Sequence, residues 1–205
     1  MKNKKKKIVK GEYGYIHNQK IRRSLTSLGL FAIPMFGFIG AYLLLGTTRN
    51  IFTVIALVGC LPACRSMVGT IMMLLQKPVD PDHYKQISEH AGDLLMAYEM
   101  YLTSYEKSDF VESFAFCGNK AAGYSSRIKG SPQHVEDHVK NILKQNGYKA
   151  DVKVYTDLKQ YLERLDYLNS RKEELENSTT SKPDDRYPGM SRTEAIRHII
   201  LNISL

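Results

Sequence analysis

The sequence has only three cysteines among its 205 residues. At positions 60, 64 and 117 they are too few and too unevenly spaced for the disulfide framework of a small secreted protein. The sequence also lacks a phosphate-binding glycine loop, a dinucleotide fingerprint, a nucleophile elbow and a kinase signature. We therefore expect a reducing, cytoplasmic setting for the C-terminal part, predict no cofactor, and favour a non-enzymatic role.

Charge is nearly absent from two long stretches. Residues 24–46 contain no charged side chain, and residues 51–75 contain only Arg65. A helix over the first stretch would extend about 34 Å, enough to cross a hydrocarbon core of roughly 30 Å. Because the connection at 47–50 is short, the second helix must return antiparallel beside the first. The sequence predicts a transmembrane hairpin over residues 24–76, and the second span argues against a cleaved signal peptide.

The formal net charge of +8 is concentrated beside this hairpin. The basic N-terminal arm, residues 1–23, carries nine lysines and arginines against one glutamate, whereas residues 77–205 carry 18 basic and 20 acidic side chains. Basic flanks stay on the cytoplasmic side, so we expect a multi-pass protein of the bacterial plasma membrane with both termini cytoplasmic. Anionic lipid headgroups of the inner leaflet should contact Lys4, Lys5, Lys6, Lys7, Arg22 and Arg23. A slightly acidic C-terminal part argues against nucleic-acid binding.

Arg65 is the most unusual residue of the second stretch. An arginine at the centre of a span costs roughly 2.5 to 3.5 kcal/mol on insertion scales, and less near the headgroups. It could set the depth of the helix, or contact a lipid or another membrane protein. The residues predicted for membrane contact or assembly are Arg65, Cys60, Cys64, Gly37 and Gly40. Cys60 and Cys64 lack the usual Cys-x2-Cys spacing of metal sites.

The residue pattern of the C-terminal part predicts an α+β domain over residues 77–176, followed by a linker at 177–190 and a C-terminal helix at 191–205. Hydrophobic periodicity and turn residues give an order of about αβββαβα, a mixed sheet covered by helices. The strand at 94–103 should place Leu94, Met96, Tyr98, Met100 and Leu102 on one face. The C-terminal helix is too apolar on one face to stay wet, so it should dock on the domain, the membrane or a partner.

Two smaller features allow more than one interpretation. His134 and His138 are four residues apart on an expected helix, and this spacing allows both imidazoles to bind one metal ion. They match no known hydrolase pattern. We therefore favour an ordinary surface helix without a metal. Tyrosines and basic residues around 11–15 predict a strap lying at the membrane surface.

The element order is similar in outline to the restriction-endonuclease-like core, but a convincing Glu-x-Lys is missing, which speaks against a nuclease. Residues 11–16 (GEYGYI), 52–63 (FTVIALVGCLPA), 103–109 (TSYEKSD) and 143–148 (LKQNGY) resemble small bacterial two-span membrane proteins with a C-terminal α/β domain and no known activity. The resemblance implies this architecture and no chemistry.

We therefore expect a membrane-anchored protein whose cytoplasmic domain binds a protein partner or self-associates. An inner-leaflet enzyme of unknown reaction and an accessory subunit of a transport or secretion assembly are the alternatives. In either case anionic lipid of the inner leaflet is an expected partner.

Overall fold

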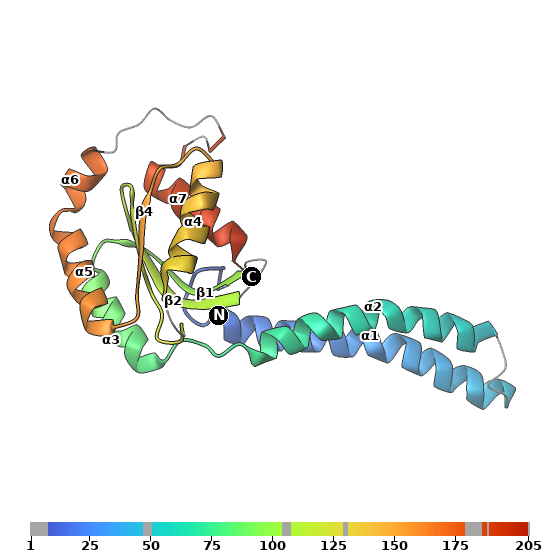
Figure 1. Ribbon diagram of the computed structural model, residues 1–205. Coiled ribbons are helices and arrows are strands. Elements are labelled where there is room, and N and C mark those ends of the chain that lie inside the picture. Colours follow the sequence, from blue (N-terminus) through green and yellow to red (C-terminus); the bar gives the residue numbers. More distant parts are fainter. Residues whose placement is uncertain are drawn as a thin grey trace, which may run out of the picture. The chain divides into compact units, whose positions relative to one another are not determined.

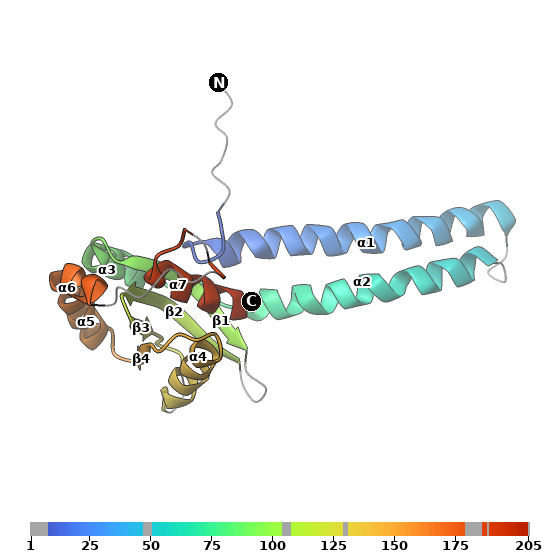
Figure 2. The same cartoon turned by 90° about the horizontal axis from the view of Figure 1, so that it is seen from above.

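The computed structural model describes residues 8–46, 51–103, 108–128, 131–178, 186–187 and 189–204. These residues form seven helices and four strands, and the chain divides into two compact units. One unit is the hairpin Ile16–Pro78, and the other joins the segment up to Tyr15 with Val79–Leu205. Figure 1 and Figure 2 show each unit from two directions.

The hairpin unit consists of two antiparallel helices, α1 (Tyr15–Leu45) and α2 (Ile51–Leu75), which lie side by side in both views (Figures 1 and 2). Both are long and apolar enough to span a membrane. The predicted helices at 24–46 and 51–75 are confirmed, except that α1 begins nine residues earlier, at Tyr15. The connecting residues 47–50 lie outside the described residues.

A polar contact joins the two helices near their open ends. The Ser27 hydroxyl lies 2.6 Å from that of Thr70 and 2.8 Å from that of Ser66. Farther along, the Lys20 ammonium donates to the Leu74 carbonyl at 3.0 Å. Ser27 and Thr70 are buried, so their hydroxyls satisfy one another between two otherwise apolar surfaces.

The second unit contains a mixed four-stranded sheet. Its strands are β1 (Leu95–Thr103), β2 (Ser108–Cys117), β3 (Lys120–Tyr124) and β4 (Asp151–Tyr155), in the order β1-β2-β3-β4. The first three are antiparallel neighbours, and β4 runs parallel to β3. A parallel pair needs a crossover connection, which helix α4 supplies. The predicted α+β class and mixed sheet are confirmed.

Helices cover both faces of the sheet, as Figure 1 shows. One face packs against α4 (Gln133–Gln145) and α7 (Arg192–Ile203), around a core that includes Phe114, Val139 and Ile200. The other packs against α3 (Pro81–Ala91) and α5 (Leu158–Ser170), around Ile87 and Tyr161. The short helix α6 (Lys172–Asn177) follows α5 and forms from the charged residues before the linker. The linker residues 179–185 and 188 lie outside the described residues.

Helix α7 docks on the domain, which decides among the three predicted docking surfaces. Its Ile196, Ile199 and Ile200 are buried against the sheet. A capping box begins the helix: the Ser191 hydroxyl accepts from the Glu194 amide, and the Glu194 carboxylate accepts from the Ser191 amide. The hydrogen bonds from Ser191 hold the pKa of Glu194 below its usual value.

The pleat of β1 is interrupted at Glu99, which corrects the prediction of one continuous apolar face. Glu99 adopts the left-handed conformation, with φ of 56°. Ala97 and Met100 therefore enter the same core, whereas strict alternation would place them on opposite faces. The partner strand is interrupted at the matching position, Glu112, because Val111 and Phe114 also enter the same core. Tyr98 still pairs with Ser113, and Met100 still pairs with Val111. The register is kept while two acidic side chains leave the regular pattern.

The N-terminal segment packs on the α+β unit through Gly11 and Tyr13, and its predicted place at the membrane surface stays a prediction. The Gly11 carbonyl accepts from the Tyr98 amide at 2.8 Å, and the Tyr13 ring stacks on Tyr84 with centroids 3.8 Å apart. Gly11 has a φ of +90°, and a β-carbon there would lie 2.8 Å from the Leu201 side chain. A glycine is needed for this close approach. The segment covers part of the outer edge of β1.

Candidate functional site

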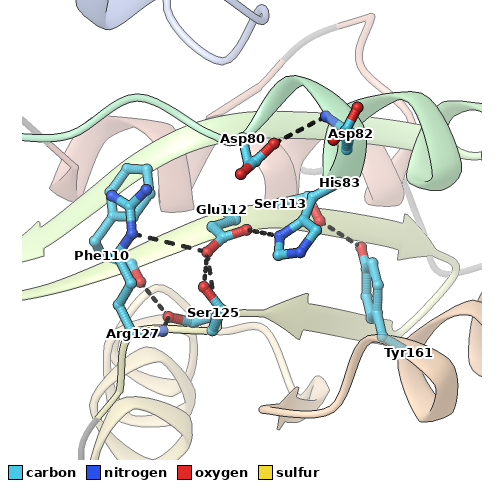
Figure 3. A network of polar contacts seen from close by, with 10 residues as sticks. Asp80, Asp82, His83, Phe110, Glu112, Ser113, Ser125, Arg127 and Tyr161 are labelled. Atoms are coloured by element: carbon cyan, nitrogen blue, oxygen red, sulfur yellow. Dashed lines mark hydrogen bonds and ion pairs between the residues drawn. The ribbon is translucent and has the colours of Figure 1, made fainter.

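A buried carboxylate is the centre of the polar network in Figure 3. Glu112 on β2 is only 1% exposed. One carboxylate oxygen accepts from Nδ1 of His83 at 3.1 Å, and the other accepts from the hydroxyl and the backbone amide of Ser126. The Arg127 guanidinium lies 4.0 Å from the same carboxylate and 4.8 Å from the centroid of the Phe110 ring. The network joins α3, β2 and the chain just after β3.

Two buried tyrosines border this network. The Tyr161 hydroxyl accepts from Ser113 at 3.0 Å, and burial raises the pKa of Tyr161. Burial, followed by the nearby Glu112 charge, raises the pKa of Tyr124 to about 12. Both phenols therefore stay neutral and act as hydrogen-bonding groups at physiological pH.

The geometry of the Glu112 network can orient an imidazole, which is one requirement of a general base. A reaction also needs a cavity where the substrate can meet that imidazole. The cavities around Lys144, Pro34 and Arg65 are lined by residues other than His83 and Glu112. The hydrogen bonds of the network hold α3 and the chain after β3 on the sheet.

A basic depression lies at the other end of the sheet. It has a volume of about 520 Å³ and is lined by Asn119, Lys120, Lys140, Lys144, Tyr148, Lys149, Ala150 and Asp151. Lys140 makes an ion pair with Glu136 at 3.6 Å, and the Lys120 ammonium lies over the ring of Tyr167. The Arg192 guanidinium lies 5.4 Å from the centroid of the Tyr148 ring and adds a further positive charge. The local surface is basic although the domain as a whole is slightly acidic.

The outer edge of β4 borders this depression. The Asp151 amide donates to Asn119, and the Tyr155 carbonyl accepts from Ser125, so alternate residues of β4 bond toward β3. The backbone groups of Val152 and Val154 therefore point to the outer edge. Among the described residues no strand pairs with that edge, although the Glu136 carboxylate accepts from the Val154 amide at 2.8 Å.

The structure brings together three of the arginines singled out in the sequence. Arg22, Arg23 and Arg65 line one cleft of about 280 Å³ within the hairpin unit. Sequence reasoning placed Arg65 apart from the other two, in a separate group of residues. Their common position follows from the antiparallel register of α1 and α2, which the sequence alone does not specify.

The remaining hairpin residues do not form a site with Arg65. Cys60 is half-buried and Cys64 is exposed, and neither lines the arginine cleft. A β-carbon at Gly37 or Gly40 would meet no atom within 4 Å, so these glycines do not serve the contact between α1 and α2. Their proposed role in contacting another membrane protein stays a prediction.

The two histidines considered for metal binding have separate environments. Nε2 of His134 lies 2.6 Å from Asp109, and its Nδ1 lies 3.0 Å from the Ser131 carbonyl. His138 is half-exposed on the same helix. Within the described ranges no group of three or more His, Cys, Asp or Glu side chains could hold a metal ion. The lysines of the predicted headgroup contact, Lys4, Lys5, Lys6 and Lys7, lie outside the described residues.

Cys117 should be unreactive in the folded protein. Its side chain is fully buried, and burial raises the pKa of its thiol, which lowers the reactive thiolate fraction. In a Cys60→Ser/Cys64→Ser variant, we expect N-ethylmaleimide to label the native protein at least about 100-fold more slowly than the protein unfolded in urea. Equal labelling rates would show that Cys117 is accessible.

Sequence reasoning missed the basic depression, because its lysines come from β3, α4 and the loop before β4. The spacing of Glu136, Lys140 and Lys144 at every fourth residue was a usable signal, since it places them on one face of α4. Comparison of the chain with protein families, with curated proteins and with solved structures found no match.

Proposed function

We propose that the hairpin anchors this chain in the bacterial plasma membrane, with both ends cytoplasmic, and that the α+β unit binds an extended acidic segment of a partner protein along β4. The distribution of exposed apolar side chains supports the anchor. Outside the hairpin unit, the only large apolar side chains exposed among the described residues are Val9, Tyr167 and Met190. Within the hairpin unit, the side chains of Phe36 and Leu44 are 74% and 87% exposed. Exposing so much apolar surface to water costs free energy, whereas exposing it to lipid does not.

The free edge of β4 carries the second part of the proposal. An extended peptide can add to an exposed sheet edge through backbone hydrogen bonds, and neighbouring pockets then select its side chains. The outward backbone groups of Val152 lie beside a depression with Lys144 and Lys149 on its wall. Acidic side chains of such a peptide would meet these ammonium groups.

Self-association along this edge is less favourable. An antiparallel pairing of two β4 strands centred on Lys153 would place that lysine directly opposite its copy, and like charges opposite one another destabilise a strand pair. The charge of the edge therefore favours a different, acidic partner.

The anchor is tested by extraction and topology. The full chain should stay with membranes in alkaline carbonate and should require detergent for release. A cysteine introduced at Asn50, in the Cys60→Ser/Cys64→Ser background, should react with an impermeant maleimide added outside intact cells, whereas one at Ser178 should react only after the cells are opened. Release by carbonate, or the opposite labelling pattern, would refute the proposed placement.

The edge is tested with a charge reversal. The probe is a labelled synthetic peptide of alternating glutamate and valine, added to the full chain in detergent micelles. A Lys144→Glu/Lys149→Glu variant should bind it at least about tenfold more weakly, because two attractive contacts become repulsive. The matched control, Lys85→Glu/Lys159→Glu, changes the same charge at exposed positions on α3 and α5 and should bind as the parent does.

Hydrogen exchange separates strand addition from loose charge attraction. Strand addition should slow exchange of the Val152 amide when the peptide is bound, because that amide gains a hydrogen bond. Binding without this protection, or equal loss of binding in both charge variants, would count against the edge.

A further inference from the structure

We propose that the hairpin unit binds one anionic phospholipid. The phosphate lies between Arg22, Arg23 and Arg65, and an acyl chain lies in an adjoining apolar cleft. This inference rests on the membrane placement proposed above and is independent of the β4 edge.

The arginine cleft is basic and lacks an internal counter-ion. Its remaining lining consists of Gln19, Thr26, Ser66, Gly69 and Thr70. The sequence contains no aspartate or glutamate between Glu12 and Asp80, so the hairpin unit cannot neutralise these arginines itself. Three guanidinium groups around one cleft suit a phosphate, which accepts hydrogen bonds from several donors at once.

The depth of the three arginines matches a headgroup. Arg65 immediately precedes Ser66, which contacts Ser27, whereas Arg23 lies four residues before Ser27. The Cα of Arg65 is therefore about five residues of helix, or roughly 7.5 Å, deeper than that of Arg23. A long arginine side chain can bridge this difference and reach the headgroup level. This explains how a charge inside the second apolar stretch is accommodated.

The walls of the cleft are held in place by hydrogen bonds. The Thr70 hydroxyl lies 3.2 Å from the Arg23 carbonyl, and the Thr26 hydroxyl donates to the Arg22 carbonyl at 2.9 Å. The contact of Ser27 with Ser66 and Thr70 fixes the two helices at this level. The cavity of about 280 Å³ is roughly nine times the volume of a water molecule in the liquid, which leaves room for a phosphodiester and part of a glycerol.

An apolar cleft continues the same groove farther from the chain ends. Its volume is about 320 Å³, and it is lined by Leu30, Ile33, Pro34, Gly37, Ile55, Ala56 and Gly59. On α1 the residues of the two clefts follow one another at spacings of three and four, which places them on one face of the helix. A charged cleft followed by an apolar one on that face fits a headgroup and its acyl chain, whereas a free phosphate would use only the first.

The test uses the full chain in nanodiscs of phosphatidylcholine that contain a minor fraction of phosphatidylglycerol. Native mass spectrometry measures which lipid stays bound. The parent should retain phosphatidylglycerol in preference to phosphatidylcholine. Replacing Arg22, Arg23 and Arg65 by glutamine should reduce this preference on the order of 100-fold, because each basic group contributes about fivefold.

Two matched controls make the assignment specific. A Lys85→Gln/Lys144→Gln/Lys159→Gln variant removes the same charge from exposed positions of the α+β unit and should keep the preference. Gly37→Leu should fill the apolar cleft and weaken retention, whereas Gly40→Leu, at a position that is equally open but does not line the cleft, should not.

The outcomes separate this proposal from the membrane anchor. A chain that stays in the membrane but shows no phosphatidylglycerol preference, or loses it equally in the lysine control, overturns the lipid site alone. If millimolar inorganic phosphate in pure phosphatidylcholine stabilises the parent against heat as strongly as phosphatidylglycerol does, the lipid assignment is also overturned. Release of the chain by carbonate would instead refute the membrane placement beneath it.

Discussion

Replacing Glu112 with alanine is expected to lower the free energy of unfolding of the α+β unit by about 3 kcal/mol. The carboxylate is almost fully buried and accepts hydrogen bonds from His83 and from both the amide and the hydroxyl of Ser126. Without it these donors lose their acceptor, and the Arg127 charge loses its nearby anion. The lost hydrogen bonds are charge-assisted and converge on a buried carboxylate, so together they contribute more than an exposed pair, although the donors themselves reach water.

The labelling rate of Cys117 in urea provides the measurement, again in the Cys60→Ser/Cys64→Ser background and in detergent. The control is Asp166→Ala, which removes a carboxylate at 2.8 Å from His90 where both side chains are exposed. Exposed pairs contribute little, so this variant should cost less than about 1 kcal/mol. If the two variants are equally stable, Glu112 does not hold the α3 end of the sheet in place.

The elements with strong periodicity were predictable from the sequence. The apolar lengths of α1 and α2 and the Ser191–Glu194 capping box each specify local structure through contacts between near neighbours. Such signals are independent of the rest of the fold. They were sufficient to give the αβββαβα order and the mixed sheet.

Features that depend on distant contacts were not predictable. Alternation along β1 gives no sign that Glu99 interrupts the pleat, because the interruption is matched by Glu112 on the neighbouring strand. The Tyr13 ring finds Tyr84 some seventy residues later, and no local pattern records that stacking. The arginine cleft likewise depends on the register of two helices, which the Ser27 contacts determine.

The same distinction explains why the candidate sites were only partly foreseen. Each of Arg22, Arg23 and Arg65 is conspicuous as a charge beside or within an apolar stretch, so the sequence identifies the residues. What it cannot show is that they share one cleft. The basic depression beside β4 is harder still, because a single net charge for the domain hides a local excess of lysine.

The docking of α7 provides the prediction with the largest expected effect. Ile200 is fully buried between this helix and the sheet, in the core that contains Phe114 and Val139. Ile200→Asp would place a charge in an apolar environment with no partner, and it would also remove apolar contacts. We expect a loss of at least about 4 kcal/mol, which approaches the lower end of the roughly 5 to 15 kcal/mol by which native proteins are stable.

The consequence should extend across the sheet, because α7 covers both β1 and β2 and Ser204, which follows α7, bridges to Leu102. Cys117 should then become labelled without urea, while the hairpin keeps the chain in detergent micelles. Asn202→Asp places the same charge on an exposed part of α7 and should leave Cys117 protected. Protection of Cys117 in both variants would mean that α7 is only loosely attached. In that case α7 could leave the sheet and dock on the membrane or a partner, and the stability of the sheet would have to come from α3, α4 and α5.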